Sequence, residues 1–319
     1  MAWIIGIDEA GYGPNLGPFV MTAVACQVHD ALAEGDLWQA LAPAARREGD
    51  KDEGRLLVAD SKVVYSTARG LLGLERGVLG ALWRDGPCPA LGGLVDWACP
   101  GDHADLRAEA WYKGDSALPV RAEAEDLAGH AARFDAACAA AGVGRWVARS
   151  AVVCTPRFNA LVDRAGSKGA VLATALGSLL RRGLESAAGD DAVSFFVDKH
   201  GGRNAYAAQI QQSLGRGAVV AREEGMARST YEVMGLGRAV RLTFQPRAEA
   251  EHFCVALASM ASKYLREVLM LEFNRFWQGH VPGLKATAGY PGDAARFLAE
   301  VRDAAARLGV AEAALWRRK

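Results

Sequence analysis

Short apolar runs and longer amphipathic segments alternate along most of the chain. Residues 3–7 and 18–28 are apolar and rich in β-branched side chains, a pattern that predicts two buried strands joined by a Gly-Pro turn. In later segments leucine, valine and alanine recur at helical spacing, which is typical of helices with one buried face. The expected strands are at 3–7, 18–28, 145–154, 192–197, 218–222, 229–233 and 239–244, and the expected helices at 67–83, 122–141, 159–185, 253–277 and 293–308. This mixture indicates an α/β fold with helices packed on a sheet.

Charge and composition narrow the functional classes. The 319 residues include 37 Lys+Arg and 37 Asp+Glu, so the formal net charge is zero. This balance argues against bulk attraction to nucleic acid or membranes, although it allows a local basic patch. No apolar run has membrane-spanning length, no secretion signal is visible, and the six scattered cysteines are typical of reduced thiols. We therefore expect a cytoplasmic protein without a membrane partner.

Residues 84–119 interrupt the alternation. This segment is rich in glycine and proline and has only isolated aromatic anchors, so we interpret it as a loop-rich insertion. Cys88, Cys99 and His103 lie within it and are of the residue types that bind zinc. Their spacing matches no compact zinc motif and a fourth ligand is missing, so an insertion without metal is the favoured interpretation.

Acidic residues follow several of the predicted strands. Asp8 and Glu9 end the first one, Asp198 ends a later one, and Glu249 and Glu251 follow the last. Ligands of open α/β sheets collect at strand ends, so we expect these carboxylates at one edge of the sheet. There they repel one another unless cations compensate, and their hard oxygen atoms favour Mg²⁺ or Mn²⁺, which can drive phosphodiester hydrolysis. The competing interpretation is a solvated turn after an edge strand.

One helix face carries a second candidate for binding. Ser259, Lys263 and Arg266 are spaced i, i+4 and i+7 in the predicted helix at 253–277, so they share one stripe. Their donor groups suit a phosphate backbone, and a solvated helix face is the alternative.

The motifs around these acids resemble those of one enzyme family. Residues 8–18 (DEAGYGPNLGP) resemble the opening motif of ribonuclease HII, normally D-E-A-G-R-G-P-x-x-G-P. Further matches follow in order: DSK at 60–62, VD at 197–198, RAEA at 247–250 for the family's K-[AG]-D-[AS], ALASMASKYLRE at 256–267 and GY at 289–290. The chain is therefore similar to a divergent ribonuclease HII, with Gly-Tyr-Gly in place of Gly-Arg-Gly and an insertion at about 84–141.

This resemblance implies a fold and an activity. The fold would be a ribonuclease-H-like α/β fold, in which a mixed sheet with antiparallel strands first and parallel strands after is flanked by helices. A catalytic domain at 1–260 would be followed by a helical C-terminal part at 261–319 that grips the substrate. The activity would be endonucleolytic hydrolysis of the RNA strand of RNA–DNA hybrids, or of RNA-containing duplex DNA, with Mg²⁺ or Mn²⁺, leaving 5′-phosphate and 3′-hydroxyl ends. A monomer is favoured.

The resemblance also implies roles for individual residues. The catalytic metal ligands would be Asp8, Glu9, Asp198 and Glu249. The substrate-binding residues would be Gly11, Tyr12 and Gly13 near the 2′-hydroxyl that marks RNA, Ser259, Lys263 and Arg266 near the phosphates, and Tyr290 against the neighbouring sugar.

Two departures from the family pattern bear on function. Tyr12 stands where the family has arginine, so a charge-assisted phosphate contact is lost. Cleavage at a single embedded ribonucleotide and cleavage of longer RNA runs are therefore alternative activities. Glu249 stands where the family has Asp, and Glu251 is the competing fourth acid, because strand alternation puts both on the same face.

The basic residues next to the third acid allow two interpretations. Lys199, His200 and Arg203 either replace the lost phosphate contact or form a solvated basic loop. The function of the chain as a whole has two competing hypotheses beside the ribonuclease. It could be a hybrid-binding protein without catalysis, or a nuclease of this fold with another nucleic-acid substrate.

Overall fold

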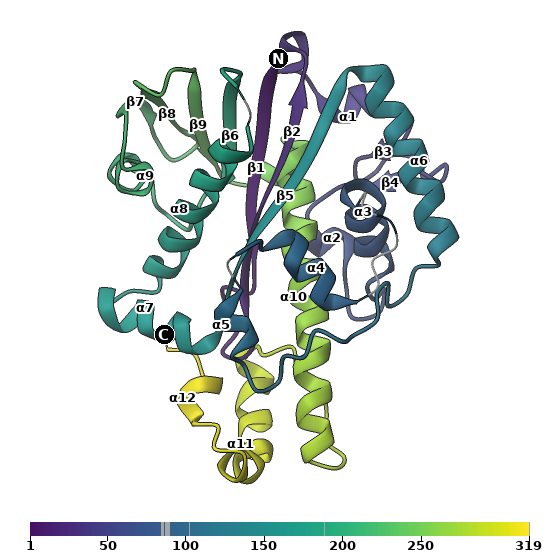
Figure 1. Cartoon of the computed structure of the whole chain (residues 1–319), viewed down its shortest axis with the longest axis vertical. Helices are drawn as coiled ribbons and strands as arrows, with labels where there is room; N and C mark the ends of the chain where they lie inside the picture. Colours follow the sequence, from purple (N-terminus) through teal and green to yellow (C-terminus); the bar gives the residue numbers. More distant parts are fainter. Residues whose placement is uncertain (84–85, 87–89, 102, 188, 319) are drawn as a thin grey trace.

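The structure is a computed structural model, and it describes residues 1–83, 86, 90–101, 103–187 and 189–318. A seven-stranded sheet runs through the centre of this part of the chain (Figure 1). Its strands are β1 (Ala2–Ala10), β2 (Phe19–Val28), β5 (Val143–Val153), β6 (Ala192–Asp198), β7 (Ala218–Glu224), β8 (Ser229–Met234) and β9 (Val240–Gln245), and a small second sheet is formed by β3 (Ala45–Arg46) and β4 (Leu56–Leu57). The helices are α1 (Leu37–Ala40), α2 (Ser61–Val64), α3 (Leu72–Leu82), α4 (Leu91–Ala98), α5 (Ala104–Arg107), α6 (Ala124–Ala141), α7 (Thr155–Ala165), α8 (Gly169–Ser186), α9 (Ala207–Leu214), α10 (Phe253–His280), α11 (Pro291–Arg307) and α12 (Glu312–Leu315), with 3-10 turns η1 (Asp30–Leu32) and η2 (Ala248–Ala250).

The order and direction of the strands confirm the predicted fold class. The sheet order is β5-β2-β1-β6-β9-β8-β7. β1 pairs with β2, and β2 with β5, in antiparallel fashion, whereas β1 pairs with β6, and β6 with β9, in parallel. Antiparallel strands first and parallel strands after, with helices on both faces, is the ribonuclease-H-like arrangement. Because β1, β6 and β9 are parallel neighbours, their carboxyl ends meet at one edge of the sheet.

The two faces of β1 contribute to two separate cores. Ile4 packs in the core that contains α10, whereas Ile5 and Ile7 pack in the core that contains α7 and α8, as side-chain alternation requires. Gly6 lies beneath α10, and a Cβ built on it would be 2.1 Å from the backbone nitrogen of Val255. The absence of a side chain at this position is what allows α10 to cross β1 so closely.

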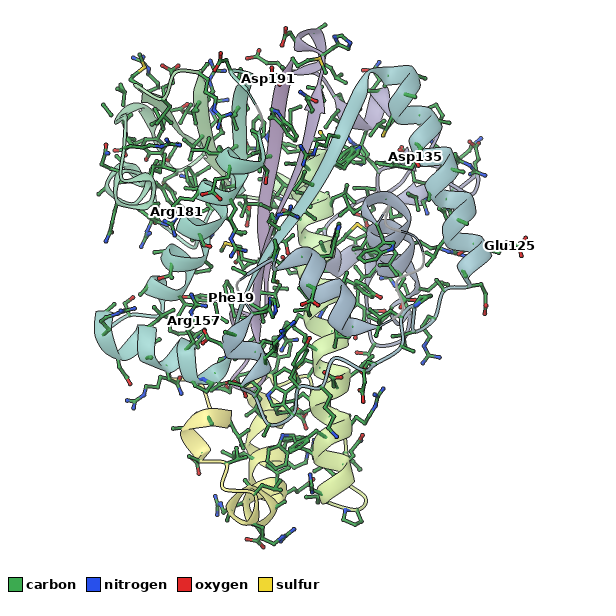
Figure 2. The ribbon with its side chains drawn as sticks, in the orientation of Figure 1. Phe19, Glu125, Asp135, Arg157, Arg181 and Asp191 are labelled. Atoms are coloured by element: carbon green, nitrogen blue, oxygen red, sulfur yellow. The ribbon has the colours of Figure 1, made fainter. Side chains whose placement is uncertain are left out.

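The expected insertion is more helical than its glycine and proline content indicated. Besides α6, which was predicted as a helix at 122–141, it contains α4 and α5. α6 packs beside α3, with Glu125 on its outer side (Figure 2). Arg84, where the insertion was expected to begin, and Cys88 lie outside the described residues. Nδ1 of His103 lies 2.9 Å from the backbone oxygen of Cys99.

Two buried carboxylates attach the insertion to the rest of the protein. Glu75 of α3 accepts hydrogen bonds from the backbone N–H groups of Arg121 and Ala122, at 2.8 and 2.7 Å. Glu272 of α10 accepts one from the backbone N–H of Gly114 at 3.2 Å. Buried acids bonded in this way fix the path of a segment that has little apolar pattern of its own.

Several helix predictions differ from the structure. The single helix expected at 159–185 is divided into α7 and α8, because Gly166 ends α7 in the left-handed conformation with φ of 63°. The spacing of apolar residues alone does not indicate that a helix ends at this glycine. The helix α9 was not predicted, since its eight residues carry one fully buried side chain, Ile210.

The long helix α10 passes the expected division at residue 260 without interruption. Beyond it, α11 and α12 form the helical C-terminal part at one end of the molecule (Figure 1). The division into a catalytic and a substrate-gripping part therefore stays a prediction about function and does not coincide with the end of a helix. Within the described residues, no helix combines the length and the apolar character needed to cross a membrane.

Candidate active site

Three neighbouring strands bring acidic residues to one edge of the sheet. Asp8 and Glu9 lie near the end of β1, and Asp198 is the last residue of β6. Glu249 lies in η2, the turn that follows β9. β1 stays paired with β2 beyond Ile7, where its pairing with β6 ends, so the acid pair lies within a strand and not in the solvated turn of the competing interpretation.

The four carboxylates act on one another electrostatically. Burial is the largest cause that raises the pKa of each, and with the charge of Asp198 it raises the pKa of Glu9 to about 7. For Asp8, the second largest cause that raises the pKa, next to burial, is the charge of Glu9. The charge of Asp198 also raises the pKa of Glu249. The charged form of every member is therefore disfavoured in the folded protein, as expected for clustered acids without a compensating cation.

Asp198 is bonded directly to the turn that carries Glu249. Its Oδ1 accepts a hydrogen bond from the backbone N–H of Ala248 at 3.2 Å. The preceding Arg247 adopts the left-handed conformation, with φ of 55°, at a cost of about 1–2 kcal/mol for a residue with a side chain. This turn brings the acid that follows β9 back toward the acid that ends β6.

Glu251 does not join the four acids. Its Oε2 accepts a hydrogen bond from Nε2 of Gln245 at 2.8 Å, and it lines a separate hollow with Phe196 and His252. Strand alternation predicted a shared face for Glu249 and Glu251, and that prediction is wrong because the chain at 248–250 is a 3-10 turn. Glu249 is the acid that the fold brings to the site.

A buried histidine faces Glu9. Nε2 of His200 lies 3.7 Å from Oε2 of Glu9, and burial, with the charge of Arg203, lowers the pKa of His200 to about 4. In the described part of the chain, Oε2 of Glu9 and both ring nitrogens of His200 are buried without a hydrogen-bond partner. The histidine is therefore not part of a solvated basic loop, and the unpartnered carboxylate oxygen is available to a cation.

Lys62 of the DSK motif is a cation beside the acids. It lies in α2, and its backbone N–H donates to Oδ1 of the N-cap residue Asp60 at 3.0 Å. The charge of Lys62 lowers the pKa of Glu9 and of Asp198, while Asp60 is the main cause that raises the pKa of Lys62 itself. Sequence reasoning assigned Lys62 no role, although the matched motif contained the signal for it.

Ser259 is the member of the α10 stripe that reaches the acids. Its Oγ lies 3.2 Å from Oγ of Ser61, and its hydrogen bond to the Asp8 side chain lowers the pKa of that carboxyl. One turn further along α10, Oγ of Ser262 donates to the backbone oxygen of Asp8 at 2.9 Å. α10 thus holds the end of β1 through its serines.

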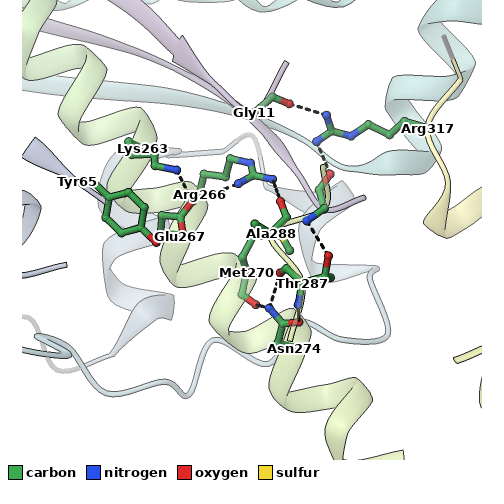
Figure 3. A network of polar contacts seen from close by, with 12 residues as sticks. Gly11, Tyr65, Lys263, Arg266, Glu267, Met270, Asn274, Thr287, Ala288 and Arg317 are labelled. Carbon is green, nitrogen blue, oxygen red and sulfur yellow. Dashed lines mark hydrogen bonds and ion pairs between the residues drawn. The ribbon is translucent and has the colours of Figure 1, made fainter. Parts of the chain in front are cut away.

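Lys263 and Arg266 are engaged inside the protein (Figure 3). Nζ of Lys263 lies 2.6 Å from Oε1 of Glu267, and Nη2 of Arg266 donates to the backbone oxygen of Ala288 at 2.9 Å. Oε2 of Glu267 accepts a hydrogen bond from the hydroxyl of Tyr65 at 2.9 Å. Arg266 is only 1% exposed, so it holds the turn before residue 289 and does not present the phosphate-binding guanidinium that we expected.

The glycine loop at 11–17 is packed against the C-terminal part. Gly11 and Gly17 have φ of 81° and 79°, which side-chain-bearing residues rarely adopt. A Cβ on Gly11 would be 2.3 Å from Nε of Arg266. The backbone N–H of Asn15 donates to the backbone oxygen of Gly289 at 2.7 Å, which ties the loop to the expected Gly-Tyr motif.

Arg317, near the C-terminus, closes the same loop from another direction (Figure 3). Its Nη1 donates to the backbone oxygens of Gly11 and Pro14 at 2.6 and 3.3 Å, and its Nη2 donates to that of Gly17. Its own backbone N–H donates to the backbone oxygen of Asn15 at 2.9 Å. Burial lowers the pKa of Arg317 to about 9, which leaves it charged at neutral pH. No sequence pattern indicated this role.

Tyr290 lies beside the loop. It is 49% exposed, and a Cβ on Gly13 would be 3.9 Å from its Cε1. The guanidinium carbon of Arg266 is 5.9 Å from the centre of the Tyr290 ring. An exposed ring next to a glycine-rich backbone is suited to stacking on part of a nucleotide.

Tyr12 stands among opposite charges. Burial and the negative charge of Glu9 raise its pKa, while the positive charge of Arg203 lowers it. Nζ of Lys168 lies 4.9 Å from the centre of the Tyr12 ring and 3.3 Å from its backbone oxygen. The position that carries arginine in ribonuclease HII is therefore occupied by an uncharged ring with two cations near it.

The four acids are of the residue type that binds divalent cations, but their side chains are not arranged around a common point. Among the residues that the structure describes, no group of three or more His, Cys, Asp or Glu side chains is arranged to hold a metal ion. The donor set is nevertheless all carboxylate, its members disfavour one another's charges, and one buried oxygen of Glu9 has no partner.

The comparisons with known proteins match solved structures at low sequence identity. No protein-family model matches the chain, and no curated protein matches it. Among solved structures, it is similar to ribonuclease HII of Archaeoglobus fulgidus in a complex with PCNA (15% identity, 99% of this chain and 94% of that chain, TM-score 0.43). It is also similar to ribonuclease H2 of Pyrococcus horikoshii OT3 (12% identity, 98% of this chain and 92% of that chain, TM-score 0.44). A further similar structure is Bst-RNase HIII in complex with Mn²⁺ (15% identity, 99% of this chain and 66% of that chain, TM-score 0.45).

Proposed function

We propose that this protein is a divalent-metal-dependent endoribonuclease of the ribonuclease H type. It would hydrolyse the RNA strand of RNA–DNA hybrids and leave 5′-phosphate and 3′-hydroxyl ends. The observation that carries the proposal is the meeting of Asp8, Glu9, Asp198 and Glu249 at the carboxyl ends of three parallel strands, with the pKa of each raised. Acids that disfavour one another's charges in this way gain most from a bound divalent cation.

The acidic residues would hold Mg²⁺ or Mn²⁺. When bound, the cation supplies activation of the attacking water and charge neutralisation at the leaving oxygen. Asp198 would also keep the turn of Glu249 in place through its hydrogen bond to Ala248. Lys62, whose side chain is 88% exposed, would meet a phosphate of the substrate and offset its repulsion by the acids.

The glycine loop would recognise the RNA strand. Gly11 and Gly13 would allow the backbone to approach the 2′-hydroxyl, and Tyr290 would stack on the neighbouring sugar. Tyr12 offers no charge to the adjacent phosphate, so substrate grip would depend on contacts elsewhere along the duplex.

A cleavage panel tests this function. Labelled duplexes with one, four or many ribonucleotides in one DNA strand are incubated with and without Mn²⁺ or Mg²⁺. We expect metal-dependent cleavage of the longer RNA runs, and weaker cleavage at the single ribonucleotide because of Tyr12. Cleavage of an all-DNA duplex at the same rate would assign a different nucleic-acid substrate.

Cation binding can be measured separately from activity. Mn²⁺ at about 100 times its dissociation constant is expected to stabilise the wild-type protein by about 2.7 kcal/mol, seen as a rise in melting temperature. Asp198→Asn should lose most of this rise. Because ionisation of Asp198 is disfavoured in the folded state, the variant should melt no lower than wild type without the cation. An equal Mn²⁺-induced rise in both proteins would contradict the metal site.

A hybrid-binding protein without catalysis is the second candidate. Two observations favour it: Tyr12 in the glycine loop, and the absence, within the described residues, of acids already arranged to hold a metal. Binding of the hybrid without any metal-dependent product in the cleavage panel would select this candidate.

A further inference from the structure

A cavity of about 610 Å³ opens between the β3–β4 region, the end of α2, α3 and α6. Residues from several separate chain segments converge on it, and five of them are arginines: Arg46, Arg55, Arg69, Arg76 and Arg133. Two aspartates, Asp52 and Asp126, share its lining. The formal charge of the whole chain is zero, so this concentration of arginines is a local departure from the average.

Three of the arginines are paired with acids, and the most distant pair joins Nη2 of Arg55 to Oε2 of Glu53 at 3.8 Å. Nε of Arg76 lies 2.7 Å from Oδ2 of Asp126, and Nε of Arg46 lies 3.4 Å from Oδ1 of Asp52, whose side chain is 74% exposed. These pairs hold the side chains in place and consume only part of their donor groups, because a guanidinium carries five N–H bonds.

Two other arginines bond neutral oxygen atoms. Nε of Arg69 donates to Oγ of Ser66 at 3.3 Å and its Nη1 donates to the backbone oxygen of Val63. Nη1 of Arg133 donates to the backbone oxygen of Gly54 at 2.5 Å. Among the described residues, no acid within ion-pair distance compensates Arg69 or Arg133, so their charges are available to an anion.

The wall formed by α6 leaves room for a ligand. Gly129 of α6 lines the cavity, and a Cβ built on it would meet no atom within 4 Å. A Cβ at this position would therefore meet no neighbour, and a larger side chain would extend toward the cavity.

We propose that this cavity binds phosphate groups, either of a nucleic-acid backbone or of a free phosphate-bearing ligand such as a mononucleotide. Guanidinium groups match phosphate oxygens with paired N–H donors, and several of them converge here. The cavity adjoins the carboxylate site through α2: Val64 lines the cavity, and Lys62 of the same helix acts on the acids. Because the cavity and the carboxylate site share α2, the favoured source of the phosphate groups is the backbone of a duplex that lies over the acids. Only this choice of source rests on the proposed function.

Two pairs of variants test the site. The double variant Arg69→Gln/Arg133→Gln removes the two uncompensated charges. The control variant Arg222→Gln removes an exposed arginine that pairs with Glu232 in the β7–β8 hairpin. Gly129→Phe places a bulky ring at the wall of the cavity, and its control, Gly129→Ala, adds only a methyl group. The glycine pair keeps the test valid if the arginine double variant fails to fold, which circular dichroism would show.

Binding is measured in EDTA, so that cleavage plays no part. The probes are a fluorescent RNA–DNA duplex, followed by anisotropy at several salt concentrations, and AMP, followed by calorimetry. We expect the arginine double variant to bind the duplex about tenfold more weakly, with a salt slope lower by about 2, and Gly129→Phe to weaken it as well. Both controls should stay within about twofold of wild type.

The outcomes separate the sources and the hypotheses. Loss of duplex affinity in Gly129→Phe and the arginine variant identifies the nucleic-acid backbone. Loss of AMP binding in the same variants, with duplex affinity unchanged, identifies a free phosphate ligand. Unchanged binding of both probes overturns the site. A wild-type protein that binds the duplex through the cavity yet cleaves nothing with Mn²⁺ would overturn the nuclease and leave the cavity proposal intact.

Discussion

Asp8→Asn and Asp198→Asn are each expected to abolish metal-dependent hydrolysis of an RNA–DNA hybrid, with a loss of rate of about 10³-fold or more. Each change removes a charged oxygen from the group of acids at the carboxyl ends of β1 and β6. The remaining acids would then compensate a divalent cation less well, and the attacking water would lose its activation. Duplex affinity in EDTA should stay close to that of wild type, because a carboxylate does not attract a phosphate backbone.

Glu251→Gln is the matched control for these variants. Glu251 lies close in sequence to Glu249, but its carboxylate bonds Gln245 and lines a different hollow. Its neutral replacement should retain cleavage within a few-fold of wild type. Rates are measured in single turnover with saturating Mn²⁺, and full activity of either aspartate variant would contradict the assignment.

The meeting of Asp8 and Asp198 could be predicted from the sequence because simple rules fix it. Each acid follows a short apolar run that can only be a buried strand, and parallel strands end at the same edge of a sheet. The pairing of Ile7 with Val197 in parallel register shows this rule at work. The order of the motifs along the chain points to the same pair of acids.

The choice between Glu249 and Glu251 could not be predicted in the same way. It depends on a turn that begins with a left-handed Arg247 and is bonded to Asp198, about fifty residues earlier. Local rules continue a strand through this segment, and the long-range hydrogen bond overrides them. The burial of His200 against Glu9 likewise depends on how two distant segments meet.

The insertion shows a further limit of local pattern. Its helices α4 and α5 were not predicted, and its attachment rests on the carboxylates of Glu75 and Glu272, which are 0% and 3% exposed. Charged residues in amphipathic helices are ordinarily assigned to the solvated face. Their burial becomes intelligible only once the backbone N–H groups that bond them are in view.

Arg317→Met is expected to lower the free energy of unfolding by about 3–5 kcal/mol and to reduce cleavage further than stability alone explains. The guanidinium is 1% exposed and donates to three backbone oxygens of the glycine loop, which would be left buried without partners. The loop would then lose the shape in which Gly11 approaches the substrate. Urea denaturation measures the first effect, and single-turnover cleavage below the unfolding transition measures the second.

The neighbouring Arg318 provides a matched control for this prediction. Its side chain is 59% exposed and pairs with Asp163 at 3.0 Å, so Arg318→Met should cost less than about 1 kcal/mol and leave cleavage unchanged. The two variants lose the same charge from adjacent positions and differ only in what the guanidinium contacts. Equal effects would show that the loop keeps its shape without Arg317. A large effect confined to Arg317→Met would identify the C-terminal arginine as a positioning residue for a loop about three hundred residues earlier in the chain.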